Sequence, residues 1–94
     1  MSSQIDQSQV PDIQTGYRLQ HEESQQAWVL LYPEGMVKLN NSAAEILKRC
    51  DGKRNIEQIV SQLETDFDET GLSSDVIAFM EIAIEQKWIT LKDG

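Results

Sequence analysis

The chain has one cysteine and one histidine, the side chains best suited to nucleophilic or metal chemistry, and their positions favour neither role. Cys50 ends a run of apolar residues at helical spacing, where a lone cysteine usually behaves as a small hydrophobic side chain. His21 lies in a separate segment that alternates like a strand, so nothing pairs the two residues as nucleophile and base. A single cysteine forms neither an internal disulfide nor a Cys-x-x-Cys site. We therefore interpret Cys50 as a core residue and predict that the protein is not an enzyme.

Two acidic clusters resemble metal sites only in composition. In His21-Glu22-Glu23, neighbouring side chains of a strand point to opposite faces and do not converge on one ion. The run from Glu64 to Glu69 lacks the spacing and the central glycine of a calcium-binding EF-hand loop. We predict no metal and no other cofactor, and we interpret both clusters as solvated ends of elements. The second run is also a candidate electrostatic contact for a basic enzyme surface.

Length, charge and composition narrow the function further. A chain of 94 residues forms one domain by size, with a core too modest to enclose a deep active site unaided. The net charge of −8 opposes binding to a nucleic-acid backbone and suits a partner with a basic patch. Residues 1–15 are rich in Gln and Ser, which predicts a disordered tail before a folded domain at residues 16–94. Met1–Asp6 does not read as a signal peptide, and no apolar run is long enough to cross a membrane, so we expect a cytoplasmic protein.

The first part of the folded domain predicts a three-stranded antiparallel sheet. Tyr17–His21 alternates between apolar and polar residues, which is the pattern of a half-buried strand. Trp28–Tyr32 is apolar throughout, as expected for a central strand with both faces covered. A tight turn at Pro33-Glu34-Gly35 leads into the short strand Met36–Leu39. We expect this third strand to lie at an edge of the sheet.

Helical patterns follow the strands. Ser42 and Glu45 have the spacing of a capping box, which predicts the start of a first helix. Asp51-Gly52 ends that helix, because glycine adopts the backbone angles of a helix terminus. Asn55 is the expected cap of a second helix, with Gln58 three residues later. The sequence thus predicts an α+β fold with the sheet first and the helices after it.

The third helix carries more apolar surface than one packed face requires. Ser73 or Ser74 is its expected cap, and the segment Trp88–Leu91 after it is a candidate short strand. At about 100° per residue the apolar side chains spread over roughly 200°, against a stripe of about 100° for simple packing. These side chains are Val76, Ile77, Phe79, Met80, Ile82, Ala83 and Ile84. We expect the surplus to face a dimer partner, a second protein or a peptide.

Several motifs, in this order, resemble the pyrroloquinoline quinone biosynthesis protein D family. The resemblance spans residues 17 to about 90, and the combination of motifs is more specific than any one of them. The motifs are Arg18-Leu19, Leu30-Leu31-Tyr32-Pro33-Glu34-Gly35, Leu39-Asn40, Ala44-Glu45-Ile46-Leu47, Cys50-Asp51-Gly52, Asp75-Val76 with Phe79, and Trp88-Ile89. The resemblance implies a winged-helix-like domain of three strands followed by three helices. It also implies a chaperone that binds the quinone's precursor peptide and delivers it to a radical S-adenosylmethionine enzyme, which cross-links a glutamate and a tyrosine of the peptide.

An edge strand offers a physical means of holding such a peptide. Its unpaired N–H and C=O groups can bond to an extended peptide, and apolar pockets then supply the remaining affinity. We expect the peptide to lie between the third strand and the third helix. The candidate peptide-binding residues are Met36, Val37, Lys38, Leu39, Val76, Phe79, Met80 and Ala83. A weaker hypothesis assigns Glu34, Asp51 and Gly52 to a surface that faces the enzyme.

Two alternatives remain open from the sequence. The surplus apolar face is also suited to a homodimer, which would make the chain a structural or interaction protein. A winged-helix DNA-binding protein is less favoured, because the third helix carries Asp75, Glu81 and Glu85 against only Lys87.

Overall fold

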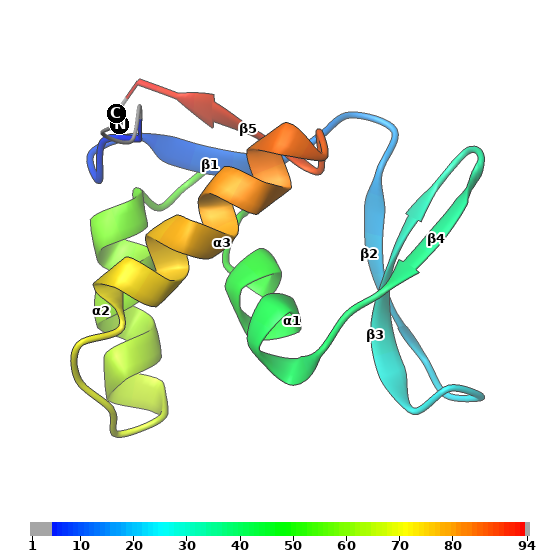
Figure 1. Cartoon of the computed structure of the whole chain (residues 1–94), viewed down its shortest axis with the longest axis horizontal. Coiled ribbons are helices and arrows are strands. Elements are labelled where there is room, and N and C mark those ends of the chain that lie inside the picture. Colours follow the sequence, from blue (N-terminus) through cyan, green and yellow to red (C-terminus); the bar gives the residue numbers. More distant parts are fainter. Residues whose placement is uncertain (1–4, 94) are drawn as a thin grey trace.

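The computed structural model describes residues 5–93 as two small sheets joined by three helices. Figure 1 shows the three-stranded sheet standing beside α1 and the two-stranded sheet lying across the ends of the helical part. This arrangement confirms the predicted α+β fold, with a final strand in addition. The elements in chain order are β1 (Val10–Ile13), β2 (Arg18–Glu22), β3 (Ala27–Tyr32), β4 (Gly35–Lys38), α1 (Asn41–Lys48), α2 (Ile56–Asp66), α3 (Ser73–Glu85) and β5 (Ile89–Lys92).

The three-stranded sheet is the predicted antiparallel meander, in the order β2-β3-β4. Tyr32 pairs with Gly35, so the turn between β3 and β4 contains only two residues. Val29 and Leu30 are completely buried at the centre of β3, as expected for a central strand. Among residues 5–93, β4 pairs with β3 alone, which confirms its position at an edge.

The two-stranded sheet corrects the prediction of disorder near the N-terminus. β1 lies inside the segment 1–15, yet it pairs antiparallel with β5 at the other end of the chain. The carbonyl of Pro11 accepts a hydrogen bond from Gly52 at 3.0 Å, and that of Gln9 accepts one from Ile56 at 3.0 Å. Pro11 is buried, so part of this segment packs into the fold although its average composition is polar. Residues 1–4 of the predicted tail lie outside the described residues.

The helix caps agree with the sequence prediction at one helix and differ at two. Asn55 and Gln58 form the predicted reciprocal capping box of α2. At α1 the cap is Asn40, whose side chain accepts from the N–H of Ala43 at 2.8 Å, so the prediction for Ser42 is wrong. The cause is position, because β4 ends at Lys38, only two residues before Asn40, and Ser42 already lies inside the helix.

α3 begins without the predicted serine cap. Leu72 occupies the capping position, and no side chain there hydrogen-bonds to the first N–H groups of the helix. Ser73 and Ser74 are instead the first two helical residues, so neither prediction holds. The connection that precedes the helix sets this start, since the N–H of Leu72 donates to the carboxylate of Glu64 at 3.0 Å.

One apolar core joins the sheet to all three helices. Cys50 belongs to it, which confirms the interpretation of this residue as a core side chain. β3 contributes Leu30 and β5 contributes Ile89, so strands from both sheets enclose the same core. The helices contribute most of the buried residues, which are Ala43, Ala44, Ile46, Leu47, Ile56, Ile59, Val60, Leu63, Val76, Met80 and Ala83.

We predict that Asn40→Ala destabilises the fold and that Ser42→Ala does not. Loss of an N-cap side chain costs about 1 kcal/mol of unfolding free energy, within a range of about 0.5–2 kcal/mol. Ser42 is exposed within the first turn, where alanine is the better helix former, so its replacement should change stability by less than about 0.5 kcal/mol. Urea unfolding followed by circular dichroism measures both variants, and equal losses would contradict the assignment of the cap.

Candidate functional site

The open edge of β4 presents the backbone groups of Met36 and Lys38. In an antiparallel pair, every second pair of residues exchanges hydrogen bonds across the ladder. The N–H of Leu39 donates to the carbonyl of Trp28 at 2.9 Å, and Val37 lies opposite Leu30 two residues earlier. Val37 and Leu39 therefore direct their backbone groups toward β3. Those of Met36 and Lys38 point away from the sheet, where an added strand can bond to them.

The side chains of β4, and that of Leu39 directly after it, divide between the two faces of the sheet. Leu39 is only 6% exposed and fills the core, and Val37 packs against the same core from a half-buried position. Met36 is 46% exposed on the other face, and Lys38 is exposed on the same face. Of the four strand residues predicted to bind a peptide, only Leu39 is enclosed by the fold.

Met36 lies on the outer face of the sheet, with Lys38 two residues away on the same strand and Arg18 two strands away. Arg18 is opposite Leu31, and Leu31 is opposite Met36, so these three side chains form a row across the strands. Lys38 belongs to the adjacent row, opposite Val29. The β4 side of this face therefore combines the exposed apolar surface of Met36 with the positive charge of Lys38, although the whole chain is acidic.

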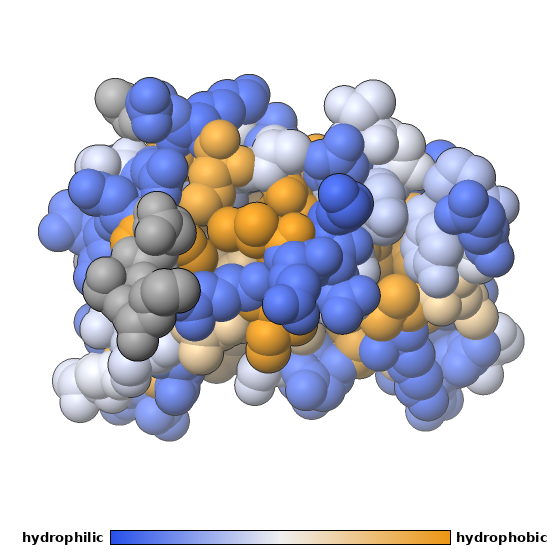
Figure 2. Space-filling model, turned by 45° about the horizontal axis from the view of Figure 1, so that its top comes forward, coloured by the Kyte–Doolittle hydropathy of each residue, from blue (hydrophilic) through white to orange (hydrophobic). Residues whose placement is uncertain are grey.

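The four predicted residues of α3 are mostly core residues. Val76, Met80 and Ala83 are buried, whereas Phe79 is half-buried with its ring centroid 6.3 Å from that of Trp88. The predicted apolar surplus of this helix is confirmed, because Ile82 and Ile84 are exposed. Figure 2 shows apolar side chains gathered on the face that carries the β1–β5 sheet.

The structure does not place β4 and α3 side by side. α3 packs mainly against α2 and β5, whereas β4 packs mainly against β3. Figure 1 shows the two elements on different sides of the molecule, with α3 over the helical part and β4 at the outer side of the sheet. The two predicted halves of the peptide site are therefore two separate surfaces in this conformation.

A cavity of about 480 Å³ lies where the start of α1, the end of α2 and the start of α3 meet. Of the predicted peptide-binding residues only Val76 lines it, so sequence reasoning missed this feature. The signal in the sequence was the pair Phe67 and Leu72, two large apolar residues inside an acidic connection. The lining residues are Asn41, Ser42, Glu45, Ile46, Leu63, Phe67, Glu69, Leu72, Asp75 and Val76.

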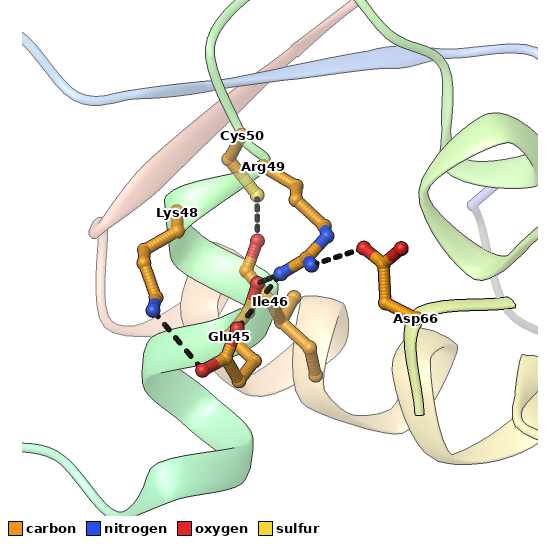
Figure 3. A network of polar contacts seen from close by, with 6 residues as sticks. All are labelled: Glu45, Ile46, Lys48, Arg49, Cys50 and Asp66. Carbon is orange, nitrogen blue, oxygen red and sulfur yellow. Dashed lines mark hydrogen bonds and ion pairs between the residues drawn. The ribbon is translucent and has the colours of Figure 1, made fainter. Parts of the chain in front are cut away.

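Arg49 ties the end of α1 to the end of α2 (Figure 3), and its partner Glu45 lines this cavity. Its Nη1 donates to the carboxylate of Glu45 at 2.9 Å, and its Nη2 donates to that of Asp66 at 2.7 Å. Lys48 pairs with the other oxygen of Glu45 at 3.0 Å. The hydrogen bond from Arg49, followed by that from Lys48, lowers the pKa of the Glu45 carboxyl below its ordinary value.

Cys50 has the properties of a structural thiol. Burial, with smaller contributions from the nearby carboxylates of Asp51 and Asp12, raises its pKa to about 12. Its Sγ donates to the carbonyl of Ile46 at 3.3 Å. A thiol in this state carries almost no reactive thiolate at neutral pH.

The three residues assigned to an enzyme-facing surface do not lie together. Glu34 is exposed in the turn between β3 and β4, whereas Asp51 and Gly52 follow α1 and contact β1. Gly52 has a φ of +78°, and a Cβ atom at this position would lie 2.9 Å from the carboxylate of Asp12. Asp51 and Gly52 thus have a structural role against β1.

The described residues include no group of three or more His, Cys, Asp or Glu side chains able to hold a metal ion. Among residues 5–93, no helix has the length and apolar character needed to span a membrane.

Comparison with known proteins identifies the family. The family model for Coenzyme PQQ synthesis protein D (PqqD) matches residues 27–89. The chain belongs to the PqqD family. A PqqA binding protein of Stutzerimonas stutzeri is 46% identical over 91 residues, which cover 96% of this chain and 99% of the relative. A PqqA binding protein of Pseudomonas aeruginosa is 51% identical over 84 residues, which cover 88% and 91% of the two chains.

A solved structure confirms the fold. It is the solution NMR structure of the PqqD truncation of Methylobacterium extorquens PqqCD, described as a functional and stand-alone recognition element for ribosomally synthesised and post-translationally modified peptides. The TM-score is 0.73 at 26% sequence identity, and the match covers 86% of this chain and 88% of that one. The resemblance drawn from the sequence motifs is therefore confirmed at the level of family and fold.

We predict that Glu45→Gln lowers stability at neutral pH and that the loss disappears in acid. Because the pKa of Glu45 is lowered in the folded state, its contribution is complete above the ordinary value of 4.5 and is lost as the pH falls through the lowered value. Glu45→Gln should reduce the unfolding free energy by about 0.5–1 kcal/mol at pH near 7. Glu81→Gln, an exposed change in the middle of α3, is the matched control. Urea unfolding of both variants from neutral to acid pH measures the loss of unfolding free energy. A loss for Glu45→Gln that did not change with pH would contradict the prediction.

Proposed function

We propose that this chain binds the precursor peptide PqqA as a recognition element and presents it to a radical S-adenosylmethionine enzyme in pyrroloquinoline quinone biosynthesis. The observation that carries the proposal is the match to relatives named PqqA binding proteins. They are 46% and 51% identical to this chain, and the matches cover 99% and 91% of their lengths. The likeness to a solved peptide-recognition element supports the same role. In this proposal the chain is a non-catalytic binding protein, and the enzyme cross-links a glutamate and a tyrosine of the peptide. The encounter takes place in the cytoplasm, where the free thiol of Cys50 suits reducing conditions.

Strand addition at β4 is the proposed binding mode. The outward N–H and C=O groups of Met36 and Lys38 offer four hydrogen bonds, worth about 2–6 kcal/mol in total. Micromolar affinity requires about 8 kcal/mol after the cost of ordering the peptide, so side chains must add to the backbone contacts. Met36 supplies exposed apolar surface, and Val37 supplies a smaller contact on the inner face. Lys38 favours an acidic residue in the peptide segment that lies beside it on the outer face.

In this proposal some residues of α3 support the fold and others contact the peptide. Val76, Met80 and Ala83 keep the helix in place from inside the core, and Leu39 does the same for β4. Phe79 is the predicted α3 residue with accessible surface for the peptide. A peptide long enough to leave the edge of β4 and reach Phe79 would contact both surfaces.

A homodimer is the second candidate function, and the exposure of Ile82 and Ile84 favours it. Sedimentation over a range of concentrations distinguishes the two, because a dimer interface on α3 would make the mass depend on concentration. The hypothesis that Glu34, Asp51 and Gly52 face the enzyme stays a prediction. Glu34 is the member of this set whose side chain is exposed at a hairpin turn.

We predict that PqqA shifts the backbone amide signals of residues 36–39 in an NMR titration. A strand bonded to β4 changes the electronic environment of the outward amides of Met36 and Lys38 most directly. Smaller shifts are expected for the exposed part of α3 around Phe79. Shifts confined to other elements would keep the function and move the site. Absence of any shift at high peptide concentration would contradict binding by the chain alone.

We also predict that Lys38→Pro weakens PqqA binding far more than Lys38→Ala does. Proline removes the outward N–H of residue 38 without removing a ladder bond to β3, which is the position where an edge strand tolerates it. Affinity for PqqA should fall roughly tenfold or more for Lys38→Pro and less than about threefold for Lys38→Ala. Calorimetry gives the affinities, and circular dichroism checks that both variants are folded. Equal effects of the two changes would show that the side chain, and not the backbone edge, binds the peptide.

A further inference from the structure

The cavity between the three helices has an apolar floor and an accessible aromatic rim. Ile46, Leu63 and Val76 are buried residues that turn part of their surface to it, and Leu72 is half-buried beside them. Phe67 stands at the rim with 49% of its surface exposed. A volume of about 480 Å³ lies within the range of about 300–1,000 Å³ that ligand sites occupy, so the cavity has room for large side chains of a partner.

The rim of the cavity carries uncompensated negative charge. Glu45 is neutralised by Arg49 and Lys48, but Glu69 and Asp75 take part in no ion pair among the described residues. Carboxylates beside an apolar floor attract a lysine or arginine more strongly than carboxylates in open water do. The matching ligand is therefore a protein segment in which a large apolar side chain lies next to a basic one.

The connection that forms the rim is held in place before any partner arrives. The N–H of Glu69 donates to the carbonyl of Glu64 at 2.9 Å, and the N–H of Leu72 donates to the Glu64 carboxylate at 3.0 Å. The Cζ of Arg49 lies 5.9 Å from the ring centroid of Phe67, and its Nη2 bonds to the neighbouring Asp66. A preformed site loses little entropy on binding, which favours recognition of a partner.

We propose that this cavity binds a segment of the radical S-adenosylmethionine enzyme, with an apolar side chain on the floor and a Lys or Arg beside Glu69 and Asp75. The inference rests on the proposed function, because a protein that presents a peptide must hold peptide and enzyme at the same time. Two simultaneous partners require two surfaces that do not overlap. No residue of β4 lines the cavity, so the residues proposed for strand addition and those proposed for the enzyme are different sets.

The test uses the full chain with two cavity variants, Phe67→Ala and Glu69→Lys. Their matched controls are Ile84→Ala, which also removes an exposed apolar side chain, and Glu23→Lys, which makes the same charge change in the turn between β2 and β3. Affinities for the purified enzyme and for PqqA are measured separately by calorimetry. We expect enzyme binding to weaken roughly fivefold or more for each cavity variant, with PqqA affinity unchanged and both controls close to wild type. The effect of Glu69→Lys should also diminish at high salt.

Each other outcome contradicts the inference in a recognisable way. Loss of PqqA affinity with unchanged enzyme binding would make the cavity part of the peptide site. Loss of self-association in the cavity variants would assign it to a second copy of the chain. Unchanged affinity of the cavity variants for both partners would show that the cavity binds neither. Loss of enzyme binding in Glu34→Lys alone would place the enzyme on the β3–β4 hairpin. Failure of the wild-type chain to bind PqqA would instead overturn the proposed function itself.

Discussion

The junction between β4 and α1 is the constraint on which both candidate surfaces depend. Leu39 is held twice there, by a hydrogen bond from its N–H to Trp28 and by burial of its side chain in the core. Asn40 follows Leu39 and caps α1, so these two residues alone join the strand to the helix. A one-residue slip of β4 would expose Leu39 and move the cap, which makes the register costly to change. The outward groups of Met36 and the rim of the helical cavity are therefore positioned by the same few residues.

Arg49 performs the corresponding task between α1 and α2. A guanidinium that is largely removed from water is costly unless carboxylates compensate it, and here one carboxylate comes from each helix. Its contacts to Glu45 and Asp66 therefore favour one separation of the two helices. The ring of Phe67, which stands at the cavity rim, lies within cation–π distance of the same guanidinium, at 5.9 Å. The electrostatic link that stabilises the helical part is also what shapes the surface proposed for the enzyme.

Local patterns in the sequence predicted the local structure well. The alternation of β2, the apolar run of β3 and the capping box at Asn55 each depend on neighbours within a few residues, and the structure contains all three. β1 was missed because its partner is β5, about eighty residues away, and composition reports nothing about such pairing. Ser42 was a reasonable cap by type, but the end of β4 decided that Asn40 takes this position. The expected groove between β4 and α3 depended on how these two elements lie relative to each other. The periodicity of a single element does not determine this arrangement.

The distribution of charge suggests how one small domain could serve two partners without competition. The outer face at β4 carries Lys38 next to the exposed Met36, so its complement is apolar and acidic. The helical cavity carries Glu69 and Asp75 around an apolar floor, so its complement is apolar and basic. Apolar contact alone would not distinguish these ligands, since both surfaces offer it. Opposite charge does distinguish them, because placing either ligand on the wrong surface would bring like charges together.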